Sequence, residues 1–204
     1  MKGIDALHEG WVHPRRIRVL AEAAARLLPV NLRVLDVGCG DGLLAAALSV
    51  LRPDLAVEGA EVLPRPGCRI PVAAFDGLHL PFPDASFGAC LLVDVLHHTE
   101  SHAALLAEAA RVGSGVVLLK DHLRDGFAAG PRLRFMDVVG NRRHGVALPF
   151  NYLSSGEWSS VFARCGLGVA GRDALDGLYP FPASLVFGRG LQFMALLRRD
   201  APKN

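Results

Sequence analysis

The feature that most constrains this chain is a short apolar strand that runs into a glycine-rich turn and then into a helix. The sequence VLDVGCGDG occupies residues 34–42, and the apolar stretch LLAAALSVL follows it at 43–51. Glycines at alternate positions, Gly38, Gly40 and Gly42, let the backbone turn tightly and let a ligand lie against bare main chain. This order of elements is typical of the carboxyl edge of an open parallel sheet, where such folds bind their ligands.

The rest of the chain alternates strand-sized apolar runs with helical stretches, which predicts an α/β fold whose parallel sheet is covered on both faces. We expect residues 173–190, rich in glycine, proline and aromatic residues, to form a loop. The predicted helices span residues 14–28, 43–51, 101–112, 127–139 and 154–165, and the predicted strands span 32–36, 56–61, 72–75, 89–93, 115–120, 167–172 and 191–197.

Composition narrows the class of protein further. A chain of 204 residues that is 51% apolar suits one domain with a sizeable core, and its net charge of +2 gives no argument for nucleic acid or an anionic membrane as partner. No apolar run approaches the ~18 residues of a membrane span, and the N-terminal residues lack the apolar region of a signal peptide. We therefore expect a cytoplasmic protein, and its four scattered cysteines fit reduced thiols.

The spacing of the glycine turn separates the ligands that it can hold. A dinucleotide fingerprint needs a third glycine at position 43, where this chain has Leu43, and no phosphate-binding GxxxxGK[ST] is present. Asp36 and Asp41 also place negative charge beside the turn. Such charge disfavours a pyrophosphate and favours an ammonium or sulfonium group.

At these residues the chain resembles the class I S-adenosylmethionine-dependent methyltransferases, whose first motif VLDVGCGDG closely matches. The resemblance continues in order through AVEGAEVLPRP (56–66) and FDGLHLPFPDASFGACLLVDVLHH (75–98), and covers about residues 34–121. The general likeness is to small-molecule enzymes of the quinone-methylating type. It implies a Rossmann-like three-layer sandwich with a seven-stranded, mostly parallel sheet. We expect one domain over 1–204, with a helical lid at 1–30, a cofactor core at 31–122 and a substrate-side region at 123–204.

The resemblance also implies a set of residues that bind S-adenosylmethionine. Glu61 matches the acidic residue that binds the ribose hydroxyls, and its place about 20 residues beyond the turn suits a carboxylate acceptor for a diol. Asp76 matches the acceptor for the adenine amino group; the alternatives are a solvated strand end for Glu61 and a turn residue for Asp76. The expected cofactor-binding residues are Asp36, Gly38, Cys39, Gly40, Gly42, Glu61, Val62, Asp76, Gly77, Leu78, Asp94, Val95 and His97.

Candidate catalytic bases come from two histidine-bearing segments. His98 follows the fourth predicted strand, and His122 ends the fifth at the same edge of the sheet. Either could accept a proton if the methyl acceptor is a hydroxyl; the alternatives are structural histidines. His97, His98 and His102 lie close together, yet we expect no metal site because no further ligand is evident from the sequence.

Four further residues are candidates for the substrate side. Trp11 precedes the N-terminal helix, and Arg143, His144 and Tyr152 lie in a loop at 140–153 that is expected to cover the site. An arginine there can bind a carboxylate or phosphate of the substrate. Core packing of Trp11 and a solvated basic loop are equal alternatives.

Absent motifs point to a small methyl acceptor. The chain has no [DN]PP[YF] after the fourth strand, no Pro-Cys nucleophile there and no acidic cluster of the metal-dependent catechol type. We therefore predict in-line methyl transfer from S-adenosylmethionine to oxygen, nitrogen or carbon of a small molecule, by a monomer or homodimer. Two alternatives remain open: a non-catalytic cofactor-binding module that acts through a partner, and a nucleotide-dependent oxidoreductase, although no Tyr-x-x-x-Lys is present.

Overall fold

A computed structural model describes residues 8–141, 148–188 and 190–200. Its centre is a seven-stranded sheet in the order β3-β2-β1-β4-β5-β7-β6. Neighbouring strands run parallel except at β7, which pairs antiparallel with both β5 and β6. The predicted seven-stranded, mostly parallel sheet is thus confirmed. The strands are β1 (Arg33–Val37), β2 (Ala56–Glu61), β3 (Val72–Ala74), β4 (Ala89–Val93), β5 (Val116–His122), β6 (Leu167–Asp173) and β7 (Gln192–Arg199).

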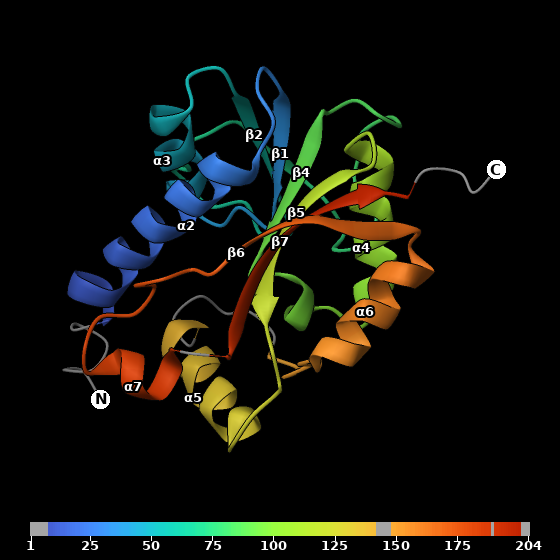
Figure 1. Ribbon diagram of the computed structural model, residues 1–204. Coiled ribbons are helices and arrows are strands. Elements are labelled where there is room, and N and C mark those ends of the chain that lie inside the picture. Colours follow the sequence, from blue (N-terminus) through green and yellow to red (C-terminus); the bar gives the residue numbers. More distant parts are fainter. Residues whose placement is uncertain (1–7, 142–147, 189, 201–204) are drawn as a thin grey trace.

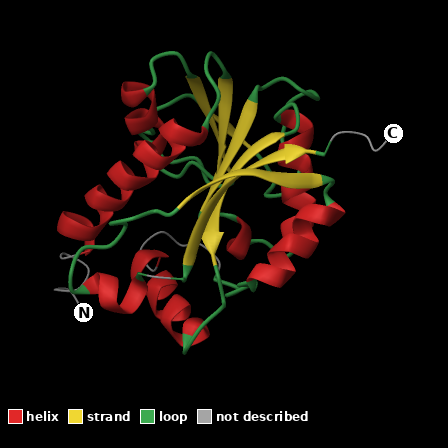
Figure 2. Cartoon of the chain, in the orientation of Figure 1, coloured by secondary structure: helices red, strands yellow, loops and turns green. Residues whose placement is uncertain are grey.

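Helices cover both faces of the sheet, which gives the three layers expected (Figures 1 and 2). Helices α2 and α3 lie on one face and α4 and α6 on the other, while α5 and α7 lie beyond the carboxyl end of β5 (Figure 1). The helices are η1 (His8–Val12), α2 (His13–Leu27), α3 (Leu43–Leu51), η2 (Leu96–His98), α4 (His102–Val112), α5 (Ala129–Asn141), α6 (Ser155–Arg164) and α7 (Ala183–Phe187). None of the described helices combines the length and apolar character needed to cross a membrane.

The alternation of side chains along each strand builds two separate cores. In β1, Val34 belongs to the cluster that packs under α2 and α3, and Leu35 belongs to the cluster that packs under α4 and α6. Successive residues of a strand point to opposite faces, so a sheet covered on both sides needs apolar residues at every position. The sequence ACLLV of β4 meets this demand at the centre of the sheet.

Helix α6 is anchored at its start and in turn anchors the end of β5. The predicted capping box is present: Ser154 Oγ accepts from the Glu157 amide at 3.3 Å, and Glu157 Oε2 accepts from the Ser154 amide at 2.7 Å. One turn later, the indole Nε1 of Trp158 donates to the carbonyl of His122 at 2.9 Å. The last residue of β5 is therefore held in place by the helix behind it.

The structure corrects the expectation of a loop near the carboxyl end of the chain. Residues 173–190 are not all loop, because Ala183–Phe187 form the short helix α7. This helix buries none of its residues and has no side-chain cap, so the sequence shows neither a helical period nor a capping pattern that would predict it. In addition, Leu96–His98 form a 3-10 turn where no element is predicted, and β5 ends at His122, two residues beyond the predicted range 115–120.

Candidate functional site

A pocket of about 420 Å³ opens at the carboxyl edge of the sheet, beyond β1, β4 and β5. It has two ends of different chemistry. The loop end is formed by the turn after β1, with Asp36, Gly38, Cys39, Gly40 and Asp41 in its lining. The histidine end is formed by residues after β4, at the end of β5 and on α5, and its lining includes Asp94, His97, His98, His122 and Asp137.

The three glycines of the loop end all have positive φ, at 72°, 59° and 74°. A Cβ on Gly38 would lie 2.6 Å from Val95 Cγ2, and one on Gly42 would lie 2.9 Å from Cys68 Sγ, so neighbouring side chains exclude larger residues there. A Cβ on Gly40 would meet no atom closer than 4.0 Å. Because Gly40 also lines the pocket, its bare backbone is the part of the loop that a ligand can approach.

Glu61 stands at the end of β2, beside the loop. Its Oε2 accepts from the Gly40 amide at 2.8 Å, and its Oε1 accepts from the Val62 amide at 2.8 Å. A carboxylate in this place can accept from ligand hydroxyls that lie against the loop. Ribose binding by Glu61 stays a prediction.

Asp36 is the buried acidic group of the loop end, with 2% of its surface exposed. Burial, followed by the charge of Glu61, raises the pKa of Asp36 to about 7. A bound cation would favour its ionised form. This electrostatic environment suits the positively charged ligand that the loop sequence suggests.

The predicted adenine-side residues lie outside the pocket lining, at the ends of β2 and β3. Asp76 Oδ1 accepts from the amides of Leu78 at 2.8 Å and His79 at 2.6 Å, and its Oδ2 contacts His79 Nδ1 at 2.8 Å. The hydrogen bonds from His79 and Leu78 hold the pKa of Asp76 below its usual range. Asp76 is thus at least a turn residue, and its contact with adenine stays a prediction. The neighbouring side chains of Val62 and Leu78 leave an exposed apolar surface on which a ring could lie.

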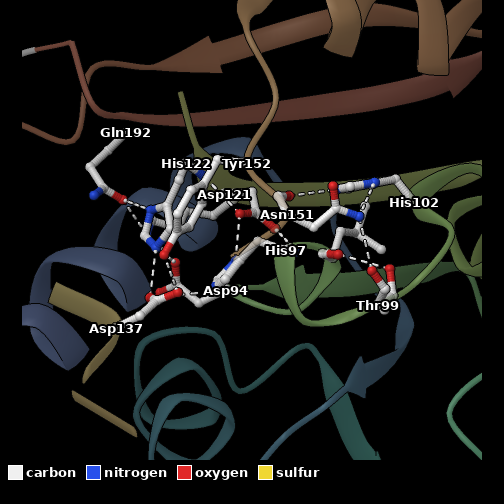
Figure 3. A network of polar contacts seen from close by, with 12 residues as sticks. Asp94, His97, Thr99, His102, Asp121, His122, Asp137, Asn151, Tyr152 and Gln192 are labelled. Atoms are coloured by element: carbon white, nitrogen blue, oxygen red, sulfur yellow. Dashed lines mark hydrogen bonds and ion pairs between the residues drawn. The ribbon is translucent and has the colours of Figure 1, made fainter. Parts of the chain in front are cut away.

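Two buried histidines dominate the histidine end, each held through its Nδ1 atom (Figure 3). His97 Nδ1 lies 2.7 Å from Asp121 Oδ1, and His122 Nδ1 lies 2.9 Å from Gln192 Oε1. Their ring centroids are 4.5 Å apart. The Nε2 atoms of both rings approach one carboxylate oxygen, Asp137 Oδ1, at 3.5 and 3.6 Å.

Asp137 and Asp94 complete this cluster, and both carboxylates lie near His122 Nε2. Tyr152 Oη donates to Asp137 Oδ2 at 2.5 Å, which orients that carboxylate. Asp94, whose φ is 58°, accepts from Arg16 at 2.7 Å and from the fully buried Lys120. Asp94 Oδ1 lies 3.8 Å from His122 Nε2.

The two histidines differ in their electrostatics although they are neighbours. Burial disfavours the charged form of His97, but Asp121 and Asp137 outweigh it and raise the pKa of His97 to about 10. Burial lowers the pKa of His122, and the positive charges of Lys120 and His97 lower it further. His122 is therefore the neutral ring, and its chemistry is that of a proton acceptor or metal ligand.

The structure brings together only part of the predicted site. Val95 packs against Gly38 instead of lining the pocket, and Trp11 is 43% exposed and outside the lining. Tyr152 is buried and reaches the site through Asp137. Arg143 and His144 lie outside the described residues. The pocket does contain eight of the predicted residues: Asp36, Gly38, Cys39, Gly40, Asp94, His97, His98 and His122.

Sequence reasoning missed several polar residues of the histidine end. Lys120 and Asp121 stand in an otherwise apolar strand. Because charged residues are rarely buried without a partner, their presence there is the sequence feature that could have identified them as site residues. Asp137 and Gln192 carry no comparable signal. The first is one acidic residue on a weakly patterned helix, and the second begins an edge-proximal strand.

Comparison with known proteins agrees with this architecture. Residues 35–117 match the family model described as a methyltransferase domain. The chain is 37% identical over 101 residues to the demethylmenaquinone methyltransferase of Tropheryma whipplei (strain Twist), covering 44% of this chain and 41% of that one. It spans about two fifths of the length of the curated relatives that it matches.

Solved structures share the fold over nearly the whole chain. One belongs to the complex between the Haloferax volcanii Trm112 methyltransferase activator and a methyltransferase (TM-score 0.68, 18% identity, covering 97% of this chain and 98% of that one). Another is the 1,6-didemethyltoxoflavin-N1-methyltransferase of Burkholderia thailandensis, with bound 1,6-didemethyltoxoflavin and S-adenosylhomocysteine (TM-score 0.65, 16% identity, covering 98% and 86%).

The described sheet and helices form a Rossmann-like fold, and residues 35–117 match a methyltransferase domain. The predicted resemblance to the class I S-adenosylmethionine-dependent methyltransferases is confirmed in sequence over that stretch and in fold over the described chain.

Proposed function

We propose that this protein transfers the methyl group of S-adenosylmethionine to a small-molecule acceptor by in-line displacement. The observation that carries the proposal is one pocket that joins a bare glycine loop to a buried cluster of polar side chains. The loop end suits a cationic cofactor and the histidine end suits a polar acceptor. The reacting atoms would meet between them.

The cofactor fits the loop end in shape and in charge. The open space above Gly40 admits a ligand against the main chain, and Glu61 presents a carboxylate beside it. The acidic Asp36 favours the sulfonium and ammonium charges of the cofactor over a pyrophosphate. Because the leaving group is a neutral thioether, the chemistry needs no general acid, and catalysis comes mainly from positioning.

A small acceptor fits the size of the pocket and the character of the relatives. A volume of about 420 Å³ falls in the ordinary range of small-molecule sites. Demethylmenaquinone and 1,6-didemethyltoxoflavin, named for two similar proteins, are small molecules. On the substrate side we retain Trp11, Arg143, His144 and Tyr152 as candidates, and we retain the expectation of a cytoplasmic monomer or homodimer.

The proposed base is His98 or His122, because both line the pocket at its histidine end. A comparison of His98→Ala with His122→Ala at saturating cofactor separates them, since loss of a positioned base costs about 10²–10⁴ in kcat. If a variant keeps the wild-type kcat, the histidine that it replaces is not the base. Equal, small losses in both would show that no histidine base is needed.

The first test is thermal unfolding with S-adenosylhomocysteine, S-adenosylmethionine or NAD. A ligand at ~100 times its Kd stabilises the native state by ~2.7 kcal/mol, which for a domain of this size raises Tm by roughly 5–10 °C. We expect a shift with the two sulfur compounds and none with NAD. A shift with NAD alone would favour the oxidoreductase.

A second measurement separates the enzyme from a cofactor-binding module. The protein is incubated with S-adenosylmethionine and a small-molecule fraction of cell extract, and formation of S-adenosylhomocysteine is followed. Turnover supports the enzyme. Binding of the cofactor without turnover in any fraction would favour the non-catalytic cofactor-binding module over the enzyme.

A further inference from the structure

We propose that the histidine end of the pocket is a binding site for a divalent transition-metal ion, held by His97, His122 and Asp137, with Asp94 in reach of a fourth position. The sequence predicts no metal site, because no further ligand is evident beside His97, His98 and His102. The structure supplies such ligands from distant parts of the chain, since it brings side chains together in and before η2, at the end of β5 and on α5 (Figure 3).

The first argument is the direction of the imidazole lone pair of His122. Lys120 can only donate hydrogen bonds, so the Gln192 atom that it contacts at 2.5 Å is the amide oxygen. His122 Nδ1 meets the same oxygen at 2.9 Å and therefore carries the proton. Its Nε2 is left with a lone pair that faces Asp137 and Asp94.

The second argument is an unsatisfied atom on His97. Its Nδ1 donates to Asp121, whereas its Nε2 is buried and makes no hydrogen bond to any described residue. Its ion-pair partner, Asp137 Oδ1, is 3.5 Å away, beyond a good hydrogen bond. A buried nitrogen without a hydrogen bond requires an explanation. A metal ion between His97 Nε2 and Asp137 Oδ1 supplies one, because it would displace the Nε2 proton and bind both atoms.

The distances between the proposed ligand atoms match a small coordination polyhedron. Ligands about 2.0–2.1 Å from a tetrahedral zinc ion lie about 3.3–3.4 Å from one another. Here Asp137 Oδ1 is 3.5 Å from His97 Nε2 and 3.6 Å from His122 Nε2. Ligand atoms of Asp94, His97 and His122 also lie within 4.8 Å of one another. Asp137 would need to move by only a few tenths of an ångström relative to each histidine for these pairs to reach the spacing of ligands around an ion.

Each proposed ligand is also supported from behind, as is usual for metal sites. Asp121 orients His97, and Gln192 orients His122. Tyr152 orients Asp137 by donating to Oδ2, the carboxylate oxygen that is not a proposed ligand. Asp94 is the weakest candidate, because Arg16 and Lys120 already pair with it. Two imidazoles with one or two carboxylates suit Zn²⁺, Co²⁺, Fe²⁺ or Mn²⁺ better than Mg²⁺ or Ca²⁺.

A metal ion at this place would select the acceptor, an inference that rests on the proposed function. The ion would bind an acceptor hydroxyl as its conjugate base, the proton leaving to water. That oxygen would form the new bond to the methyl carbon while the carbon–sulfur bond breaks, leaving S-adenosylhomocysteine. The acceptor class is then a phenol, enol or other hydroxyl compound. This role excludes His122 as the general base, because one lone pair cannot serve both.

Metal binding is tested by titrating chelator-treated protein with Zn²⁺ by calorimetry and with Co²⁺ by visible absorption. We expect one ion per chain, and a Co²⁺ spectrum of nitrogen and oxygen ligands. His97→Ala, His122→Ala and Asp137→Ala should each weaken binding by more than the about 10–100-fold expected of the supporting variant Asp121→Asn.

A matched control is His79→Ala. It removes an exposed histidine that contacts an aspartate, Asp76, at 2.8 Å, and so has the same residue types outside the site. It should bind Zn²⁺ as the wild type does. Unchanged affinity in His97→Ala and His122→Ala, or equal loss in His79→Ala, would overturn the proposal.

Titration with S-adenosylhomocysteine on the same samples separates the possible failures. Wild-type protein that binds this compound but neither ion would overturn the metal site and leave the proposed function standing. Binding of one ion without the cofactor product would do the reverse. If the alanine variants fail to unfold cooperatively, Tyr152→Phe provides the milder variant, and it should weaken Zn²⁺ binding about tenfold while the fold persists.

Discussion

The two ends of the pocket are built by different means. At the loop end, one stretch of nine residues supplies a turn whose function depends on backbone and on missing side chains. At the histidine end, side chains from η2, β5, α5, β7 and the residues before α6 converge on a buried cluster. The first is local in sequence and the second is entirely long-range.

This difference decides what each end demands of the rest of the protein. The glycine turn needs only one neighbouring strand, which carries Glu61. The turn's own conformation depends on glycines that adopt positive φ. The histidine end needs every partner in place, because a buried charge without its partner costs several kcal/mol. We therefore expect changes at the loop end to affect ligand affinity, and changes at the histidine end to affect affinity and stability together.

The largest effect is expected for Gly40→Val. The valine side chain would occupy the space in which the ligand meets the loop, and a β-branched residue is strained at φ 59°. Binding of S-adenosylhomocysteine should weaken at least about a hundredfold, about 2.7 kcal/mol, measured by calorimetry.

Gly67→Val is the control for strain alone. Gly67 has φ 77°, and a Cβ there would meet nothing within 4 Å, yet the residue lies outside the pocket lining. It should destabilise the protein and leave the affinity unchanged. Wild-type affinity in Gly40→Val would mean that the ligand does not lie against this loop.

Glu61→Gln should have the next largest effect. Glutamine keeps an acceptor for the Gly40 amide but removes the charge, and a hydrogen bond to a charged group contributes about 1.5–3 kcal/mol. Affinity for S-adenosylhomocysteine should fall about 10–100-fold in calorimetry. Glu58→Gln, at the exposed Arg33 pair on the same strand, is the control and should bind normally. Equal affinity in both variants would remove ribose binding from Glu61.

Asp36→Asn should change how stability depends on pH. The pKa of Asp36 rises on folding from 3.8 to about 7, so the native state holds this proton more tightly than the unfolded chain does. The free energy of unfolding should therefore fall as the pH rises from about 4 to about 7, and the variant should show a smaller decrease, measured by urea unfolding at several pH values. Parallel curves for both proteins would show that the buried carboxyl is already ionised at low pH.

The smallest effect is expected for Ser154→Ala. Removal of this N-cap should cost about 1 kcal/mol and lower Tm by about 2–4 °C. Affinities for S-adenosylhomocysteine and Zn²⁺ should not change, since the helix retains its packing through Trp158. Weaker Zn²⁺ binding in this variant would instead show that the start of α6 controls the histidine end.

Local signals were sufficient for most of the fold. Strands 56–61 and 89–93 and the helix 43–51 were predicted to the residue, because continuous apolar runs between turn residues leave little choice. The capping box at Ser154 was also predicted, because it depends on two residues, Ser154 and Glu157, that are only three positions apart. Helix α7 was not, because five residues, none of them fully buried, beside prolines and glycines carry no helical period.

The sequence by itself determined the sheet, the glycine turn and the class of the domain, since each depends on residues adjacent along the chain. Only the tertiary structure decided the histidine end. His97, His122 and Asp137 are separated by whole strands and loops, and each alone is an unremarkable polar residue. Their chemistry arises because parallel strands end at one edge, where burial makes neighbouring charges and lone pairs interact strongly.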